Sequence, residues 1–172
     1  DPPRRAASCC RGSRGGSGAV IKVHGAIGDL HSGNYGNFVT DPAMALAKLI
    51  ATMKDENNNV TIKGFYDDVA PLTPTERRAI DEIPNIDQKL LEEFGLARQE
   101  HPESRIELQH NRPTLSVLGL EAGQVYTGTR SAIPGSASAR IEMRLVKGLT
   151  PAKQVDLLIA HIHEQGFHVV DK

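Results

Sequence analysis

Residues 137–146 alternate apolar and polar side chains, and this pattern constrains the fold of the chain more than any other feature. The apolar positions are Ala139, Ile141, Met143 and Leu145. Because successive side chains of a β-strand point to opposite faces, the pattern predicts a strand with one buried and one exposed face. Such a strand fits a sheet that is covered by helices on one face only.

Two amphipathic helices are predicted, one towards each end of the chain. The first begins at Asp41-Pro42, where aspartate caps the helix and proline takes its first position. Its apolar stripe consists of Leu46, Leu49, Ile50 and Met53. The second begins at Thr150-Pro151 and stops at Gly166, with a stripe of Val155, Leu158, Ile159 and Ile162. Each helix has the 3.6-residue period of an element that packs against a core.

Shorter elements complete the prediction. Strands are expected at residues 20–24, 60–63, 106–108, 114–118 and 167–170. Short helices are expected after Thr73 and near Asp87. Both ends of the chain thus have the order strand, helix, strand. This order predicts an α+β fold: a ferredoxin-like split βαβ two-layer sandwich, with an antiparallel sheet and two long helices on one face.

The composition indicates one folded domain at residues 19–172, with an insertion at about 65–112. Residues 1–18 have no hydrophobic period and are expected to be a linker or the edge of another domain. They hold four arginines and one aspartate, so the other 154 residues carry 16 basic and 20 acidic side chains. This balance argues against nucleic-acid binding. No apolar run is long enough to span a membrane.

Metal binding and nucleophilic catalysis find little support in the residue patterns. Cys9 and Cys10 are adjacent, which suits neither a disulfide framework nor a zinc knuckle, and they indicate a reducing, cytoplasmic compartment only weakly. His161 and His163 diverge on a helix, so they cannot chelate one ion. No G-x-S-x-G elbow is present.

Two polar residues remain as candidates. His31 lies in a loop with four glycines between positions 25 and 36, which allows its imidazole to be aimed at a ligand or to be a bystander. Arg144 lies on the polar face of the best strand, where a cross-strand glutamate is its default partner.

Several segments together resemble a known family. They are residues 29–36 (DLHSGNYG), 41–43 (DPA), 64–69 (GFYDDV), 112–115 (RPTL), 132–134 (AIP) and 141–146 (IEMRLV). In this order they resemble the dimerisation (lid) domain of the carnosinase-like and succinyl-diaminopimelate desuccinylase-like di-zinc metallopeptidases. The resemblance covers about residues 10–172, and residues 10–12 resemble the strand that enters the lid.

The resemblance implies roles for three residues. His31 is similar to a histidine that reaches across a homodimer and stabilises the oxyanion on the substrate carbonyl. Arg144 is similar to an arginine that binds the substrate carboxylate. Ser131 occupies a position where the family has an asparagine or threonine that donates to a peptide or N-acyl amino acid substrate.

The family's two zinc ions are bound by a catalytic domain whose histidine-x-aspartate motif this sequence lacks. The resemblance therefore implies a lid that is inactive alone, has no cofactor of its own, and works with the catalytic domain of its parent chain. Two alternatives stay open: a ferredoxin-like regulatory module that binds a small ligand at a dimer interface, and an interaction domain without a ligand.

Overall fold

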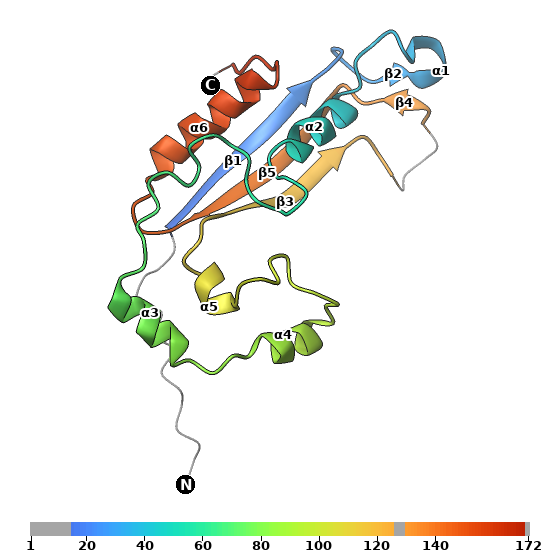
Figure 1. Cartoon of the computed structure of the whole chain (residues 1–172). Helices are drawn as coiled ribbons and strands as arrows, with labels where there is room; N and C mark the ends of the chain where they lie inside the picture. Colours follow the sequence, from blue (N-terminus) through green and yellow to red (C-terminus); the bar gives the residue numbers. More distant parts are fainter. Residues whose placement is uncertain (1–14, 126–129, 171–172) are drawn as a thin grey trace.

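The computed structural model describes residues 15–125 and 130–170. Its centre is an antiparallel sheet of β1 (Gly15–His24), β5 (Ser136–Leu145) and β3 (Thr114–Ala122), in the order β1-β5-β3. The helices α2 (Pro42–Ala51) and α6 (Pro151–Glu164) cover one face of this sheet (Figure 1). The predicted α+β class and the two-layer, ferredoxin-like arrangement are confirmed.

The central strand β5 has the two faces that its alternation predicts. Its apolar side chains, from Ala137 to Leu145 at every second position, are buried beneath the helices. They pack with the stripe of α2 and with Leu158 and Ile162 of α6. Arg140 and Arg144 are exposed on the opposite face, which no helix covers. The hydrophobic effect therefore fixes both the register of β5 and the side on which the helices pack.

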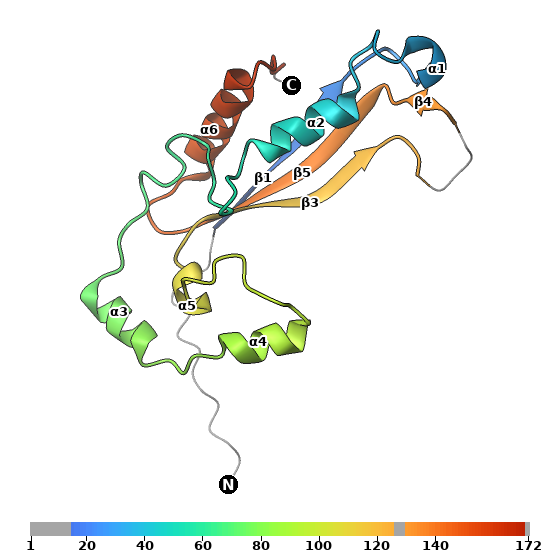
Figure 2. The same ribbon diagram turned by 45° about the vertical axis from the view of Figure 1, so that its right-hand side comes forward.

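Three short helices separate α2 from β3. They are α3 (Pro74–Asp81), α4 (Asp87–Phe94) and α5 (Ile106–Gln109). A capping box between Thr73 and Glu76 starts α3, as predicted. Both views place α3–α5 beyond the end of the sheet where β3 begins (Figure 2). We call α3–α5 and their connections, residues 74–109, the helical insert.

A small two-stranded antiparallel sheet with a short helix lies at the opposite end of the main sheet. It consists of β2 (Leu30–His31), β4 (Ala132–Ile133) and the single-turn helix α1 (Ser32–Tyr35). The two strands pair antiparallel, Leu30 with Ile133 and His31 with Ala132. For brevity we call these elements the β2–β4 hairpin, although its two strands lie about a hundred residues apart in the chain.

The predicted strand at residues 60–63 is wrong. Val60 and Ile62 are buried, so the alternation reports burial correctly. However, Val60 forms only an isolated bridge with Lys54, and its N–H donates to the hydroxyl of Tyr66. The return strand of the first βαβ half is β3, which follows the helical insert.

Two further predicted strands are also wrong. Residues 106–108 belong to α5, because the amides of Gln109 and His110 donate to carbonyls three or four residues earlier. Three residues are too few for periodicity to distinguish a strand from a helical turn. Residues 167–170 form no strand; Phe167 and Val169 instead pack individually against the core.

The sheet also extends further towards the N-terminus than expected. The strand β1 begins at Gly15, five residues before the strand predicted at residues 20–24 and four residues before the predicted start of the folded domain at residue 19. Gly15 pairs with Leu145, so these residues complete the ladder with β5. Cys9 and Cys10 lie outside the described residues. No helix in the described part of the chain has the length and apolar character needed to cross a membrane.

Candidate functional site

His31 stands exposed at the tip of the β2–β4 hairpin. It caps α1, and its Nδ1 accepts a hydrogen bond from the N–H of Gly33 at 3.1 Å. In a neutral imidazole one ring nitrogen accepts and the other donates, so this bond places the proton on Nε2. His31 thus presents a single N–H donor to whatever approaches the hairpin.

Gly33 is required for this conformation of His31. A Cβ at position 33 would lie 2.8 Å from Cε1 and 3.1 Å from Nδ1 of His31. These contacts are too close for the imidazole to stay in place. In the sequence this glycine indicates only a flexible loop. Its contact with the His31 ring is visible only in the structure.

Polar contacts join the two halves of the hairpin. The N–H and the hydroxyl of Ser32 both donate to the carbonyl oxygen of Ser131, at 2.7 and 3.0 Å. A carboxylate oxygen of Asp29 accepts the N–H of Gly135 at 3.0 Å. Each bond joins residues about a hundred positions apart. The structure therefore brings two of the three predicted site residues, His31 and Ser131, side by side.

Arg144 lies at the other end of the sheet. It is opposite Gly16 and Thr114, at the ends of β1 and β3 that face away from the hairpin. Its Nη2 lies 3.0 Å from Oε1 of Glu142, and its Nε donates to Oε2 of the same side chain at 3.1 Å. The partner is thus a glutamate of the same strand, whereas a cross-strand glutamate was expected.

The separation of these residues limits how they can act together. Antiparallel strands rise about 3.4 Å per residue, so the eight steps from Ser136, near the hairpin, to Arg144 span about 27 Å. A dipeptide spans about 7 Å when extended. One copy of the chain cannot bring His31 and Arg144 to the same small substrate.

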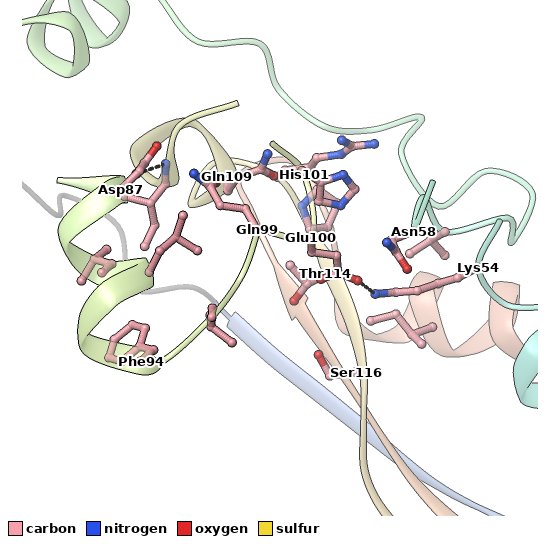
Figure 3. Close-up of a pocket in the computed structure, with 18 of the residues that line it drawn as sticks. Lys54, Asn58, Asp87, Phe94, Gln99, Glu100, His101, Gln109, Thr114 and Ser116 are labelled. Carbon is pink, nitrogen blue, oxygen red and sulfur yellow. Dashed lines mark hydrogen bonds and ion pairs between the residues drawn. The ribbon is translucent and has the colours of Figure 1, made fainter. Parts of the chain in front are cut away.

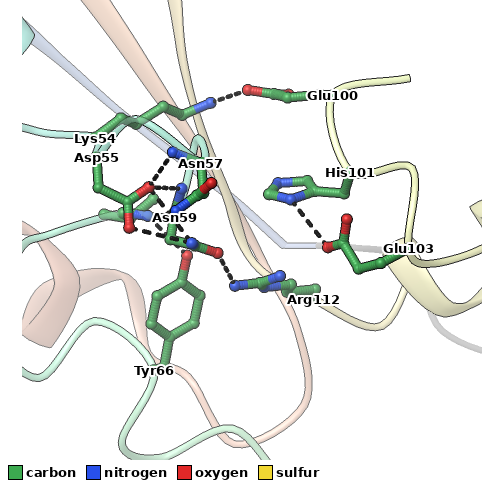
Figure 4. Close-up of polar contacts among 10 residues, drawn as sticks. Lys54, Asp55, Asn57, Asn59, Tyr66, Glu100, His101, Glu103 and Arg112 are labelled. Carbon is green, nitrogen blue, oxygen red and sulfur yellow. Dashed lines mark hydrogen bonds and ion pairs between the residues drawn. The ribbon is translucent and has the colours of Figure 1, made fainter. Parts of the chain in front are cut away.

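A third polar cluster ties the helical insert to the turn after α2 (Figure 4). Lys54 forms an ion pair with Glu100 at 2.6 Å, and the guanidinium of Arg112 donates to Asn59 at 2.6 Å. The backbone N–H and side-chain amide of Asn59 lower the pKa of Asp55, whose carboxylate accepts both. Because these partners bind one another, we assign the cluster a structural role.

The described residues contain no group of three or more His, Cys, Asp or Glu side chains that could hold a metal ion. His161 has a different role: its Nε2 lies 2.9 Å from the hydroxyl of Thr52 and so links α6 to the end of α2. Burial lowers the pKa of His161 below its usual value.

Comparisons with known proteins identify a domain family and several relatives of this chain. The family described as "Peptidase dimerisation domain" (M20_dimer) matches residues 11–169. A Cys-Gly metallodipeptidase of Candida albicans is 31% identical over 153 residues, which are 88% of this chain and 32% of the relative. A rat Beta-Ala-His dipeptidase is 30% identical over 82% of this chain and 29% of the relative.

A solved structure shares the fold as well. The M20 family metallo-carboxypeptidase Sso-CP2 from Sulfolobus solfataricus superposes with a TM-score of 0.79 and 30% identity, over 90% of this chain and 41% of that one. This chain spans about a third of the length of the curated relatives that it matches. It belongs to the M20 peptidase dimerisation domain family.

Proposed function

We propose that this chain is the dimerisation and substrate-capping domain of a zinc-dependent dipeptidase, aminoacylase or carboxypeptidase-like hydrolase. The family match and the names of the relatives support this assignment. The catalytic domain of the same protein would bind two zinc ions, which supply an activated water. The lid alone would not hydrolyse a peptide.

One observation carries the proposed division of roles: His31 and Ser131 lie together, and Arg144 lies at the opposite end of the sheet. In a homodimer, we assign the β2–β4 hairpin to the active site of the partner and Arg144 to the site of its own subunit. The Nε2–H of His31 then donates to the developing oxyanion. The guanidinium of Arg144 holds the substrate carboxylate.

The open edge of β3 supports a dimer. Within the described chain β3 pairs only with β5, so its other edge is open, and the strand has exposed apolar side chains at Val117, Leu118 and Leu120. An exposed apolar edge strand is normally covered by another strand. Antiparallel pairing of β3 with β3 of a second copy places the hairpin end of one subunit near the Arg144 end of the other.

The test is complementation between variants of the complete peptidase. His31→Ala should lower kcat by roughly 10²–10³, equivalent to about 2.7–4 kcal/mol of transition-state stabilisation. Arg144→Ala should mainly raise KM, because a carboxylate clamp binds ground and transition states alike. After subunit exchange, each dimer of His31→Ala with Arg144→Ala contains one site with an intact hairpin and an intact arginine, so activity should rise above both parents.

The control mixture is His31→Ala with Ser131→Ala. Both residues lie on the same hairpin, so every site in a mixed dimer receives one damaged hairpin, and activity should stay at the mean of the parents. If the first mixture exchanges subunits and regains no activity, His31 and Arg144 do not serve one site from different subunits.

A further inference from the structure

An apolar groove lies between the helical insert and the start of β3 (Figure 3). Its volume is about 390 Å³. One wall is formed by Leu90, Leu91 and Phe94 of α4, and the other by the first residues of β3, Thr114 to Ser116. The pair of Lys54 and Glu100 lies at one end, away from α4 in the view of Figure 3.

The groove has an uncovered apolar rim. Phe94 is 61% exposed and Leu96 is 53% exposed. An aromatic side chain on a helix that borders an open groove indicates an interaction surface. Because Thr114 and Ser116 also belong to the edge strand, this surface is continuous with the open edge of β3.

The position of the groove indicates what covers it. In a two-fold antiparallel pairing centred near Leu118, Thr114 of one copy lies opposite Ala122 of the second copy. The segment that follows β3 in the second copy then runs past the groove. The end of β3 and this segment both carry exposed apolar side chains: Leu120 of β3 is 62% exposed and Val125 is 82% exposed.

We infer that the groove between α4 and β3 receives residues 120–125 of a second copy of this chain. The helical insert thereby acts as a clamp that extends the β3–β3 contact at both ends of the dimer. Within one copy, the groove and Val125 lie at opposite ends of β3, so residues 120–125 of the same copy cannot fill it. This inference rests on the proposed dimer and adds a second contact region to it.

Cysteine cross-linking in the 172-residue chain tests the inference, with Cys9 and Cys10 replaced by serine. A single cysteine at Leu118, and a mixture of Ser116→Cys with Leu120→Cys chains, report β3–β3 pairing, because residue 116 of one copy lies opposite residue 120 of the second copy in this register. A mixture of Phe94→Cys and Val125→Cys chains reports the groove contact, and mild oxidation should give a disulfide-linked dimer that neither variant forms alone. Val20→Cys mixed with Phe94→Cys is the control, because Val20 lies on β1 at the far edge of the sheet.

The outcomes separate the two proposals. If the β3 variants cross-link and the Phe94–Val125 mixture does not, the groove inference is wrong and the dimer stands. If neither cross-links, the proposed dimer fails and the groove contact fails with it.

Sedimentation measures the dissociation constant of the dimer independently of cross-linking. Phe94→Asp should raise the dissociation constant of the dimer about tenfold or more, as expected for a buried aromatic contact. Val20→Asp, which adds the same charge at an exposed site on β1, should leave it unchanged. If Phe94→Asp abolishes binding of the apolar dye ANS to the groove and leaves dimerisation intact, the groove holds a small molecule and the inference is overturned.

Discussion

The helix-covered face of β5 and the β2–β4 hairpin begin only a few residues apart in the chain, but different forces stabilise them. The β5 face is stabilised by buried apolar side chains such as Ile141 and Met143, which have no exposed surface. The hairpin and α1 contain no buried residue, and they are held by hydrogen bonds that Ser32 donates to Ser131 and that Asp29 accepts from Gly135, each between residues about a hundred positions apart. The first region should therefore determine stability, and the second the position of His31.

The largest effect is expected from Ile141→Ala. Removing a fully buried aliphatic side chain from the core should lower the free energy of unfolding by about 2–5 kcal/mol. Urea denaturation measures the change. The matched control is Arg140→Ala, the preceding residue on the exposed face, which should change it by about 0.5 kcal/mol or less. Equal losses for the two variants would contradict the assignment of the faces.

A smaller loss of folding stability is expected at acidic pH. Burial lowers the pKa of His161 below its usual value of about 6.5, so the unfolded chain binds more protons at that residue than the folded chain. Stability from neutral His161 is complete above pH 6.5 and is lost as pH falls through the lowered pKa of the folded state. Unfolding free energies measured across this range should decline.

His161→Gln should remove the part of this decline that begins at pH 6.5. A decline of the same size in the variant would mean that other groups cause it.

Amide hydrogen exchange compares the helix-covered core with the hairpin directly. After correction for the intrinsic exchange rate at each pH, acid should lower amide protection in α2 and α6, which His161 and Thr52 link, before it affects the hairpin.

The smallest effect on stability is expected from Gly33→Ala, which should still move His31. The added Cβ would meet the imidazole at 2.8 Å, whereas the control Gly28→Ala, in the same loop, has no atom within 4 Å. Both variants should unfold within about 0.5 kcal/mol of the unchanged chain. Nitrogen-15 NMR of the ring should show the Nε2–H tautomer in the unchanged chain and in Gly28→Ala, and a different population in Gly33→Ala. Identical ring spectra for all three would show that the Gly33 contact does not set the tautomer.

The same contrast explains which parts of the structure the sequence could predict. Burial has a local period, so β5, α2 and α6 were predicted from single stretches of chain. Strand pairing has no local period in the sequence. Residues 60–63 and 167–170 resemble strands in sequence, but no strand of the described chain pairs with them. The period alone could not separate an alternating loop from an alternating strand.

The candidate site was predictable in its residues and not in its geometry. His31 and Arg144 were candidates from the residue pattern, whereas their roles and the choice of Ser131 came from the family resemblance, and the structure gives each residue a position. Their arrangement depends on the pairing of β2 with β4, which joins segments about a hundred residues apart. No local pattern reports such a contact. The role of Gly33 is easier to predict from sequence, because a glycine two residues after a capping histidine leaves room for the imidazole ring.

The contact between Arg144 and Glu142 has a consequence for selectivity. The guanidinium already holds a carboxylate before any substrate arrives, at 3.0 and 3.1 Å. If Arg144 binds a substrate carboxylate, one anion replaces another, and the arginine does not change from unpaired to paired. Much of the Coulomb energy then cancels between the two states. Discrimination would then come from how well the incoming anion fits the planar fork of the guanidinium, and Glu142 would act as an internal competitor that weakly bound or poorly oriented anions do not displace.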